Sequence, residues 1–214
     1  RFSILVAREV DRCRNQELER LVMQSELRAL QSQIHPHFLF NALNALYGSI
    51  PREAGDARGL VLNLSEVFRY FLTTSKTMVR LEEELNIVTA YLEIEKARLG
   101  PRLEVRMDVP EELLDLRIPV LSVQPLVENA IQHGVAAKAG AGWVSVVARL
   151  RNGLLTVAIR DSGPGLGETS DPASNRVGLE NLRRRLELSY AGNYSLDIHD
   201  EQKRYAVRLE INLP

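Results

Sequence analysis

The hydrophobic pattern of this chain changes at Gly100-Pro101, and that change constrains its fold more than any other feature. Before it, residues 1–35 hold no glycine or proline, and apolar residues recur at helical spacing. After it, Leu103 to Asp108 alternates between apolar and polar residues, as a half-buried strand does. We therefore expect a helical part followed by an α/β part, with the boundary near residues 76–80.

The first helical stretch has the apolar spacing of a coiled coil. Met23, Leu27, Leu30 and Ile34 follow one another at intervals of four, three and four residues. A long helix with one narrow apolar stripe usually needs a partner helix, so we expect a homodimer. A single helix packed on its own domain is the alternative.

Two further helices are expected before the strand pattern begins. Glycine and proline mark a turn region at residues 48–59, and a third helix is expected from Leu81 to Leu99. The helix between them has a predicted buried face of Leu60, Leu64, Val67 and Phe71. The first two helices would form an antiparallel hairpin, and two hairpins would make a four-helix bundle.

The residues after Pro101 predict a mixed sheet with helices on one face. Arg151-Asn152-Gly153 is a hairpin signal between two alternating strands. The expected strands are 103–108, 143–150, 154–160, 194–199 and 205–213, and the expected helices are 119–133 and 178–190. The predicted fold class is therefore α+β, with a helical hairpin and coiled coil over residues 1–78 and an α/β sandwich over residues 79–214.

Composition excludes several other classes of protein. The net charge of −1 gives no bulk attraction to nucleic acid or to an anionic membrane, and the single cysteine, Cys13, excludes an intramolecular disulfide framework. No apolar run approaches the roughly 20 residues that span a bilayer. The chain begins with Arg1 and has no signal-peptide pattern, so we expect a piece of a longer protein.

Two histidines flank a proline in the stretch Gln33-Ile34-His35-Pro36-His37-Phe38-Leu39-Phe40-Asn41. Pro36 predicts a kink or a restart of the helix at this point. A kink that presents an imidazole to solvent suits a phosphate acceptor. The alternative is that both histidines are ordinary polar residues on a helix face.

A second group of polar residues lies on the helix predicted after Pro119. Asn129 and His133 are one turn apart and share a face of that helix. An amide oxygen is a hard ligand of the kind that Mg²⁺ accepts alongside water and phosphate oxygens. The alternative is that Asn129 caps or packs a buried helix.

Glycines follow the predicted strand that ends near Asp161. Gly163, Gly165 and Gly167 alternate there, which permits a close backbone approach to a flat ligand, and Asp161 could accept from an exocyclic amine such as that of adenine. Gly178 opens the next predicted helix, whose N-terminus would bind phosphate. The polar stretch 168–175 between them could be a lid. A surface turn and an ordinary loop are the alternatives.

The order and spacing of these groups resemble a known family. Residues 120–214 resemble the ATP-binding domain shared by histidine kinases, gyrase-type ATPases and MutL-type proteins, and Gln33 to Asn44 resembles the acceptor motif of LytS-like sensor histidine kinases. In this resemblance the N box is Glu128-Asn129-Ala130-x-x-His133-Gly134. The two glycine boxes are Asp161-x-Gly163-x-Gly165 and Gly178-Leu179-x-Asn181.

The resemblance implies a role for each matching residue. His37 would be the phosphoacceptor, Asn129 would hold Mg²⁺, and Asp161 would bind adenine. The remaining residues of the implied nucleotide pocket are Glu128, His133, Gly163, Gly165, Gly178, Leu179 and Asn181. The chain departs from the family pattern at two positions: Arg176 replaces a glycine of the second glycine box, and Phe38 stands where many histidine kinases place an acid.

The resemblance implies autophosphorylation of His37 by ATP·Mg²⁺, followed by transfer to an aspartate of a response regulator. A gyrase-like or MutL-like ATPase clamp is one alternative, although such proteins carry a water-activating glutamate where this chain has Pro125. Glu128 is then the remaining candidate base. A non-catalytic dimerisation module is the third hypothesis for the function.

The resemblance also implies partners and location. We expect a homodimer and a response regulator with a LytTR-type DNA-binding output, with no direct contact of this chain with nucleic acid. We expect the chain to be the cytoplasmic region of a membrane-anchored sensor, whose anchor would lie in a missing N-terminal region.

Overall fold

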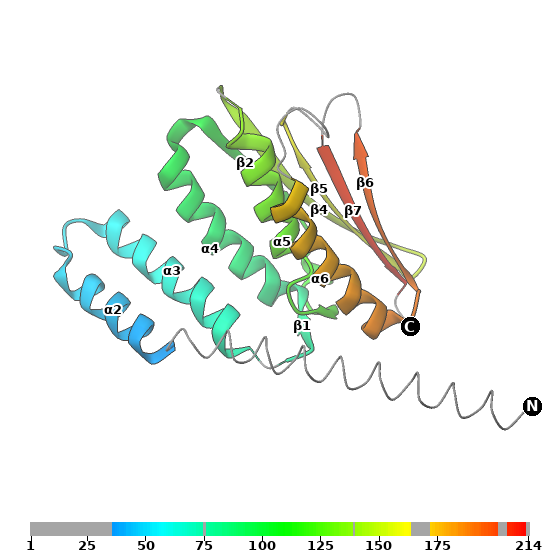
Figure 1. Ribbon diagram of the computed structural model, residues 1–214, viewed down its shortest axis with the longest axis horizontal. Helices are drawn as coiled ribbons and strands as arrows, with labels where there is room; N and C mark the ends of the chain where they lie inside the picture. Colours follow the sequence, from blue (N-terminus) through cyan, green and yellow to red (C-terminus); the bar gives the residue numbers. More distant parts are fainter. Residues whose placement is uncertain (1–35, 75, 139, 164–171, 201–204, 213–214) are drawn as a thin grey trace, which may run out of the picture. The chain divides into compact units, whose positions relative to one another are not determined.

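The computed structural model describes residues 36–74, 76–138, 140–163, 172–200 and 205–212 (Figure 1). The chain divides into two compact units, residues 1–53 and residues 54–214. The predicted coiled coil within residues 1–35 lies outside the described residues, as does the stretch that would precede a kink at Pro36.

The described part of the first unit is helix α2, Pro36–Ser49. Proline is favoured at the first position of a helix, because its missing N–H would have no partner there. The Ser49 hydroxyl donates to the carbonyl of Leu46 at 2.7 Å where the helix ends. The helix thus runs on for eight residues beyond Asn41, the last residue of the histidine motif.

The second unit begins with helix α3, Gly55–Thr73. The helix starts before the predicted position, with Asp56 in its first turn, where a carboxylate interacts favourably with the helix dipole. Of the predicted inward residues, Val67 is buried, whereas Phe71 is 38% exposed. The hairpin of α2 with α3 stays a prediction, and so does the division of the chain at residues 78 and 79.

Helix α4, Leu81–Leu99, has the predicted bounds. The backbone N–H of Arg80 donates to the Glu83 carboxylate at 3.1 Å at its start, and Gly100, with φ of 60°, follows its end. Helix α3 packs along α4 through Val67, which contacts Ile87 and Ala90.

A five-stranded mixed sheet forms the other layer of this unit, in the order β2-β4-β5-β7-β6. Only the pair β2 and β4 is parallel. The strands are β2 (Leu103–Asp108), β4 (Gly142–Arg151), β5 (Leu154–Asp161), β6 (Tyr194–Asp200) and β7 (Tyr205–Asn212). Asn152 and Gly153 both have positive φ, which confirms the predicted tight hairpin between β4 and β5.

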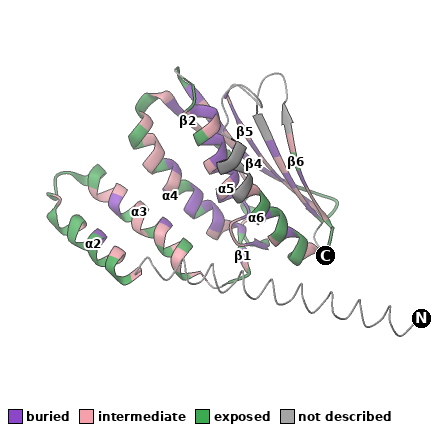
Figure 2. Ribbon diagram, in the orientation of Figure 1, coloured by how far each residue is buried: buried purple, intermediate pink, exposed green. Residues whose placement is uncertain are grey.

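Helices cover one face of this sheet, as expected for an α/β sandwich (Figure 1). Alternate residues of β4 and β5, among them Val146 and Val157, are buried, and Leu182 and Leu186 of helix α6 join the same core (Figure 2). The remaining elements are β1 (Met78–Arg80), β3 (Arg117–Pro119), α5 (Gln124–Asn129), α6 (Pro172–Tyr190) and the short helical segments η1 (Gly100–Arg102), η2 (Glu111–Leu113) and η3 (Ala130–Val135). The predicted α+β class, with helices on one face of a mixed sheet, is confirmed.

Two predicted helix starts are wrong. The helix expected from Pro119 begins only at Gln124, because Pro119 ends strand β3 and Leu121 has a positive φ of 58°. Helix α6 begins at Pro172 rather than at Gly178. Residues 172–177 contain no glycine, and proline is a favoured first residue, so the helix extends into the stretch interpreted as a lid.

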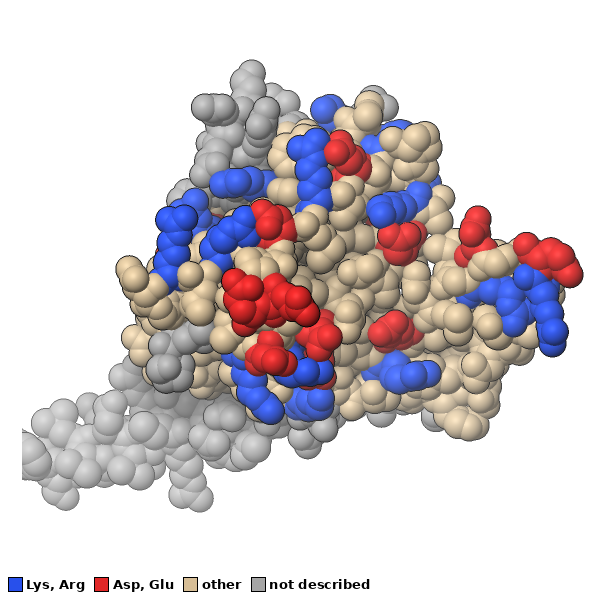
Figure 3. All heavy atoms as spheres, turned by 180° about the vertical axis from the view of Figure 1, so that it is seen from behind, with Lys and Arg blue, Asp and Glu red and all other residues tan. Residues whose placement is uncertain are grey.

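Charged side chains of both signs lie interspersed on the surface (Figure 3). Exposed pairs such as Lys76 with Glu83, 2.7 Å apart, are typical of this surface and contribute little to stability. Within the described residues, no helix combines the length and the apolar character that a bilayer crossing requires.

Candidate functional site

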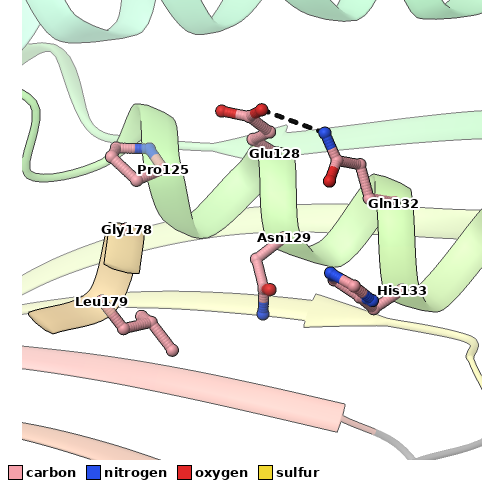
Figure 4. Close-up of a pocket in the computed structure, with 7 residues that line it drawn as sticks. All are labelled: Pro125, Glu128, Asn129, Gln132, His133, Gly178 and Leu179. Carbon is pink, nitrogen blue, oxygen red and sulfur yellow. Dashed lines mark hydrogen bonds between the residues drawn. The ribbon is translucent and has the colours of Figure 1, made fainter. Parts of the chain in front are cut away.

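A small pocket opens between helix α5 with its continuation η3 and the N-terminal half of α6 (Figure 4). Its volume is about 110 Å³. The lining residues are Pro125, Glu128, Asn129, Gln132, His133, Gly178 and Leu179. Figure 4 shows the Asn129 amide and the His133 ring projecting from the same side of their helix, as the sequence predicts.

The helix that carries these two residues changes its hydrogen-bond pattern after Asn129. Residues 130–135 form a π-helical segment, in which the N–H of Ala136 donates to the carbonyl of Ile131 at 2.8 Å. π-Helical turns are rare and occur frequently at functional sites. Asn129 is 6% exposed, so its amide is held in a fixed position beside the pocket.

Glu128 lies on a different side of α5 from Asn129 (Figure 4). Its carboxylate accepts hydrogen bonds from the side-chain amides of Gln124 and Gln132, at 3.2 and 3.0 Å. These two bonds orient Glu128 along the helix axis, away from the Asn129 amide. The assignment of Glu128 as a general base stays a prediction.

Asp161 ends strand β5 and is fully buried. Its Oδ1 accepts from the N–H of Gly163 at 2.7 Å, and Oδ2 is buried without a hydrogen-bond partner among the described residues. A buried carboxylate oxygen is costly to leave unpaired, so this atom has room for a donor that the described residues do not supply. Burial raises the pKa of Asp161 to about 6, and the Gly163 N–H opposes that rise.

Glycines are required around this carboxylate. A Cβ added to Gly134 would lie 2.2 Å from Oδ1 of Asp161, and one added to Gly163 would lie 2.4 Å from the Cα of Gly134. These distances are far inside van der Waals contact, so the backbone of η3 and the loop after β5 approach each other only because neither residue has a side chain. Of the predicted glycines in this loop, Gly163 is placed here, and Gly165 lies outside the described residues.

The second glycine box lies inside a helix. Gly178 and Leu179 line the pocket, whereas Asn181 lies farther along α6 and is exposed. Gly178 is the seventh residue of α6, so its N–H is not among the unpaired donors of the first turn. The interpretation of Gly178 as the start of a phosphate-binding helix is therefore wrong.

His37 lies in the other unit, on α2, and is exposed. Nδ2 of Asn41, four residues later, is 3.2 Å from Nδ1 of His37. His35, the other histidine of the motif, lies outside the described residues. Asn41 therefore lies on the same helix face as His37.

The sequence analysis missed one buried residue behind the pocket. Glu84 is completely buried, although it follows Glu82 and Glu83 in an acidic run. Its position on the same helix face as Leu81 and Val88 could have marked it, because a carboxylate on an apolar helix face needs polar partners.

Comparisons with known proteins agree with this geometry. Residues 25–103 match the family "Histidine kinase". Sensor histidine kinase YpdA of Escherichia coli is 37% identical over 197 residues, which cover 88% of this chain and 35% of that protein. Sensor histidine kinase YesM of Bacillus subtilis is 32% identical over 94% of this chain and 35% of its own length.

Sensor protein LytS of Enterococcus faecalis is 35% identical over 80% of this chain and 31% of its own length. The chain thus spans about a third of the length of these relatives. Among solved structures, the histidine kinase domain of the Erythrobacter litoralis blue-light activated histidine kinase has the same fold, with a TM-score of 0.51, 19% identity, and coverage of 87% of this chain and 90% of that one. Over the part of their length that it spans, the chain therefore resembles the sensor histidine kinases, with LytS among them.

Proposed function

We propose that this chain is the kinase region of a two-component sensor, which transfers the γ-phosphoryl group of ATP to His37 and then to an aspartate of a response regulator. The observation that carries the proposal is the Asp161 site, where a buried carboxylate oxygen faces no donor among the described residues, beside two glycines that admit no side chain. An exocyclic amine, as on adenine, supplies the missing donor. The family resemblance then gives the transferred group and its acceptor.

The residues of the candidate site have separate tasks in this proposal, although Asp161 is buried and is not among the residues that line the pocket. Asp161 accepts from the adenine amine, while Gly134 and Gly163 let η3 and the loop after β5 come close together around that carboxylate. Asn129 offers an amide oxygen to Mg²⁺, which neutralises charge on the phosphates when it is bound. His133, Gly178 and Leu179 line the remaining wall, which contacts the nucleotide.

The acceptor step needs few groups from the protein. A nitrogen lone pair of the His37 ring attacks the γ-phosphorus, so that a P–N bond forms, the bond from phosphorus to the β,γ-bridging oxygen breaks, and ADP leaves. A carboxylate oxygen of the regulator's aspartate then attacks the same phosphorus, and the P–N bond breaks. Positioning and charge neutralisation account for most of the catalysis in such transfers.

The wider assignments follow from the same family. Residues 1–78 would form the coiled coil and dimeric acceptor hairpin, and residues 79–214 the ATP-binding domain. The partner would be a response regulator with a LytTR-type output, and the full protein would be a sensor anchored in the membrane by a region outside this chain, with the present residues on the cytoplasmic side.

Incubation with γ-labelled ATP and Mg²⁺ tests the proposal. A kinase gives label on the protein that is lost in acid and stable in base, as expected for phosphohistidine. Release of free phosphate without labelled protein would instead indicate an ATPase clamp. The absence of both products would indicate a non-catalytic module and would refute the proposed function.

A further inference from the structure

The turn that precedes helix α5 is held by a buried carboxylate from another helix. Glu84, on α4, accepts from the N–H of Leu121 at 2.5 Å, from that of Val123 at 3.0 Å and from that of Gln124 at 3.4 Å. Gln124 is the first residue of α5, which ends with Asn129. Glu84 therefore fixes where this helix begins.

The same carboxylate also accepts a hydrogen bond from helix α3. The hydroxyl of Tyr70 donates to Oε1 of Glu84, the oxygen that also binds the N–H of Leu121. Burial, followed by the charge of Glu84, raises the pKa of Tyr70, so the hydroxyl keeps its proton and remains a donor. One carboxylate thus joins α3 to the first turn of α5.

The guanidinium of Arg185, on α6, binds backbone carbonyl groups of this turn. Arg185 donates from Nη1 to the carbonyl of Val120 at 2.5 Å and to that of Leu121 at 3.3 Å. Burial lowers the pKa of the Arg185 guanidinium, while Glu84 and Tyr70 oppose that effect. The N–H groups of the turn are bound by α4 and its carbonyls by α6.

The hydrogen bonds from Glu84 and Arg185 explain the backbone conformation of Leu121. Its φ of 58° lies in the left-handed region, which costs a leucine free energy. Strained residues persist where the surroundings over-determine them, and they cluster at functional sites. Here the Leu121 N–H is bound by Glu84 and its carbonyl by Arg185.

The two halves of the candidate site depend differently on this turn. Asn129 is carried by α5, whose start is fixed by Glu84, whereas Asp161 is carried by β5 and is paired with Gly163. A change at Glu84 should therefore displace the Asn129 side of the site more than the Asp161 side, which β5 carries and which η3 approaches at Gly134. A variant that only destabilised the whole fold would instead impair the Asn129 side and the Asp161 side to the same degree.

We propose that Glu84 is a positioning residue for the nucleotide site and couples helix α3, through Tyr70, to the helix that carries Asn129. The inference rests on the proposed function, in which Asn129 meets Mg²⁺ and Asp161 meets adenine. It extends that function because hydrogen bonds through Tyr70 and Glu84 link α3, a helix outside the pocket, to the start of the helix that carries Asn129.

The Glu84→Gln variant tests the positioning role, because Gln keeps the size of the side chain but replaces one acceptor oxygen with a donor. ADP affinity is measured in Mg²⁺ and again in EDTA. We expect the gain in affinity that Mg²⁺ gives the wild type to fall about tenfold, the usual scale for the loss of a group that orients a metal ligand. Affinity in EDTA should change by less than about twofold, because Asp161 is held by Gly163 and shares no hydrogen-bond partner with Glu84 among the described residues.

Tyr70→Phe tests the coupling to α3. Loss of one hydrogen bond should weaken the Mg²⁺-dependent gain by about threefold. In the Glu84→Gln background the same change should add almost nothing, because Tyr70 acts through Glu84. Tyr91→Phe is the matched control: it removes a hydroxyl from another tyrosine of the α3–α4 interface and should leave the gain unchanged.

Hydrogen exchange of the peptide spanning residues 120–129 provides a readout that does not depend on nucleotide. Glu84→Gln should speed exchange there more than in strands β4 and β5. Unchanged exchange in this peptide, equal losses of affinity in Mg²⁺ and EDTA, or full additivity of the two variants would each overturn the inference. If Mg²⁺ does not change the ADP affinity of the wild type, the metal role in the proposed function is refuted. Hydrogen exchange would then be the remaining test of the inference.

Discussion

Nδ2 of Asn41 lies 3.2 Å from Nδ1 of His37, one turn earlier on helix α2. This contact holds the imidazole by one nitrogen and leaves Nε2 as the ring nitrogen available to a phosphoryl donor. An amide can present either its NH₂ or, after rotation, its oxygen to Nδ1. With the oxygen accepting from Nδ1–H, the lone pair of Nε2 is free to attack.

The Asn41→Ala variant tests what this contact does. One hypothesis is that the amide also orients a water that removes phosphate from the partner regulator, by hydrogen bonding rather than as a base. We expect Asn41→Ala to keep much of its autophosphorylation and to lose phosphatase activity toward phosphorylated regulator. A packing role would instead lower the melting temperature and depress both activities together. A variant that dephosphorylates its regulator at the wild-type rate would exclude the proposed role.

His37→Gln should abolish labelling by γ-labelled ATP, because the acceptor nitrogen is removed. ADP affinity should stay within about twofold of the wild type, since His37 lies outside the pocket residues. His35→Gln, two positions away, is the matched control and should still be labelled. The assignment is wrong if His35→Gln loses the label and His37→Gln keeps it.

Asn129→Ala and Asp161→Ala should both abolish autophosphorylation, for different reasons. The first change should remove the Mg²⁺-dependent part of ATP affinity while the preference for ATP over GTP persists. The second should remove that preference, because a site built around a hydrogen bond penalises its loss heavily. Competition binding with ATP and GTP separates the two. Near-wild-type labelling in either variant removes that residue from the site.

The pH dependence of nucleotide binding should report on Asp161, whose pKa burial raises to about 6. Below that pH the carboxyl is protonated and no longer offers both oxygens as acceptors. We expect ADP affinity to be constant from about pH 7 to 8 and to fall by about tenfold near pH 5. Titration calorimetry across this range measures the effect, which Asp161→Asn should abolish.

Ionisation of Asp161, which favours nucleotide binding, should lower the stability of the folded state. Because the folded pKa of about 6 lies above the ordinary aspartate value of 3.8, protonation favours the folded state. This contribution is fully present below about pH 4 and is lost as pH rises through about 6. Asp161→Asn should therefore gain stability relative to the wild type as pH rises from 5 to 8, and a pH-independent difference would contradict the buried carboxyl.

Gly134→Ala should disrupt the contact between η3 and Asp161. The added Cβ would stand 2.2 Å from Oδ1, so we expect a loss of about 1–3 kcal/mol in the free energy of unfolding, and weaker ADP binding. Gly140→Ala is the control, since a Cβ there meets nothing within 4 Å. Urea denaturation of both variants tests the expectation. Equal stability of the two variants would show that Gly134 tolerates a side chain.

The sequence predicted most elements of the fold because their signals are local. Helix α4 has the predicted bounds because a charged N-terminal turn and Gly100-Pro101 mark its ends. The hairpin at Asn152-Gly153 was equally clear, since only a few residue types adopt positive φ at both turn positions. Asn129, His133 and Asp161 were proposed from residue type, spacing and family resemblance, and the structure places Asn129 and His133 in the wall of one pocket.

Tertiary structure decided what depends on contacts between distant residues. Helix α5 begins at Gln124 because Glu84, 40 residues earlier, binds the turn before it. Gly134 and Gly163 are needed because two separate segments meet at Asp161. Local sequence sets helix and strand propensities and the candidate chemistry of side chains. Only packing determines which buried carboxylate is paired within the protein, as Glu84 is, and which keeps an oxygen for a ligand, as Asp161 does.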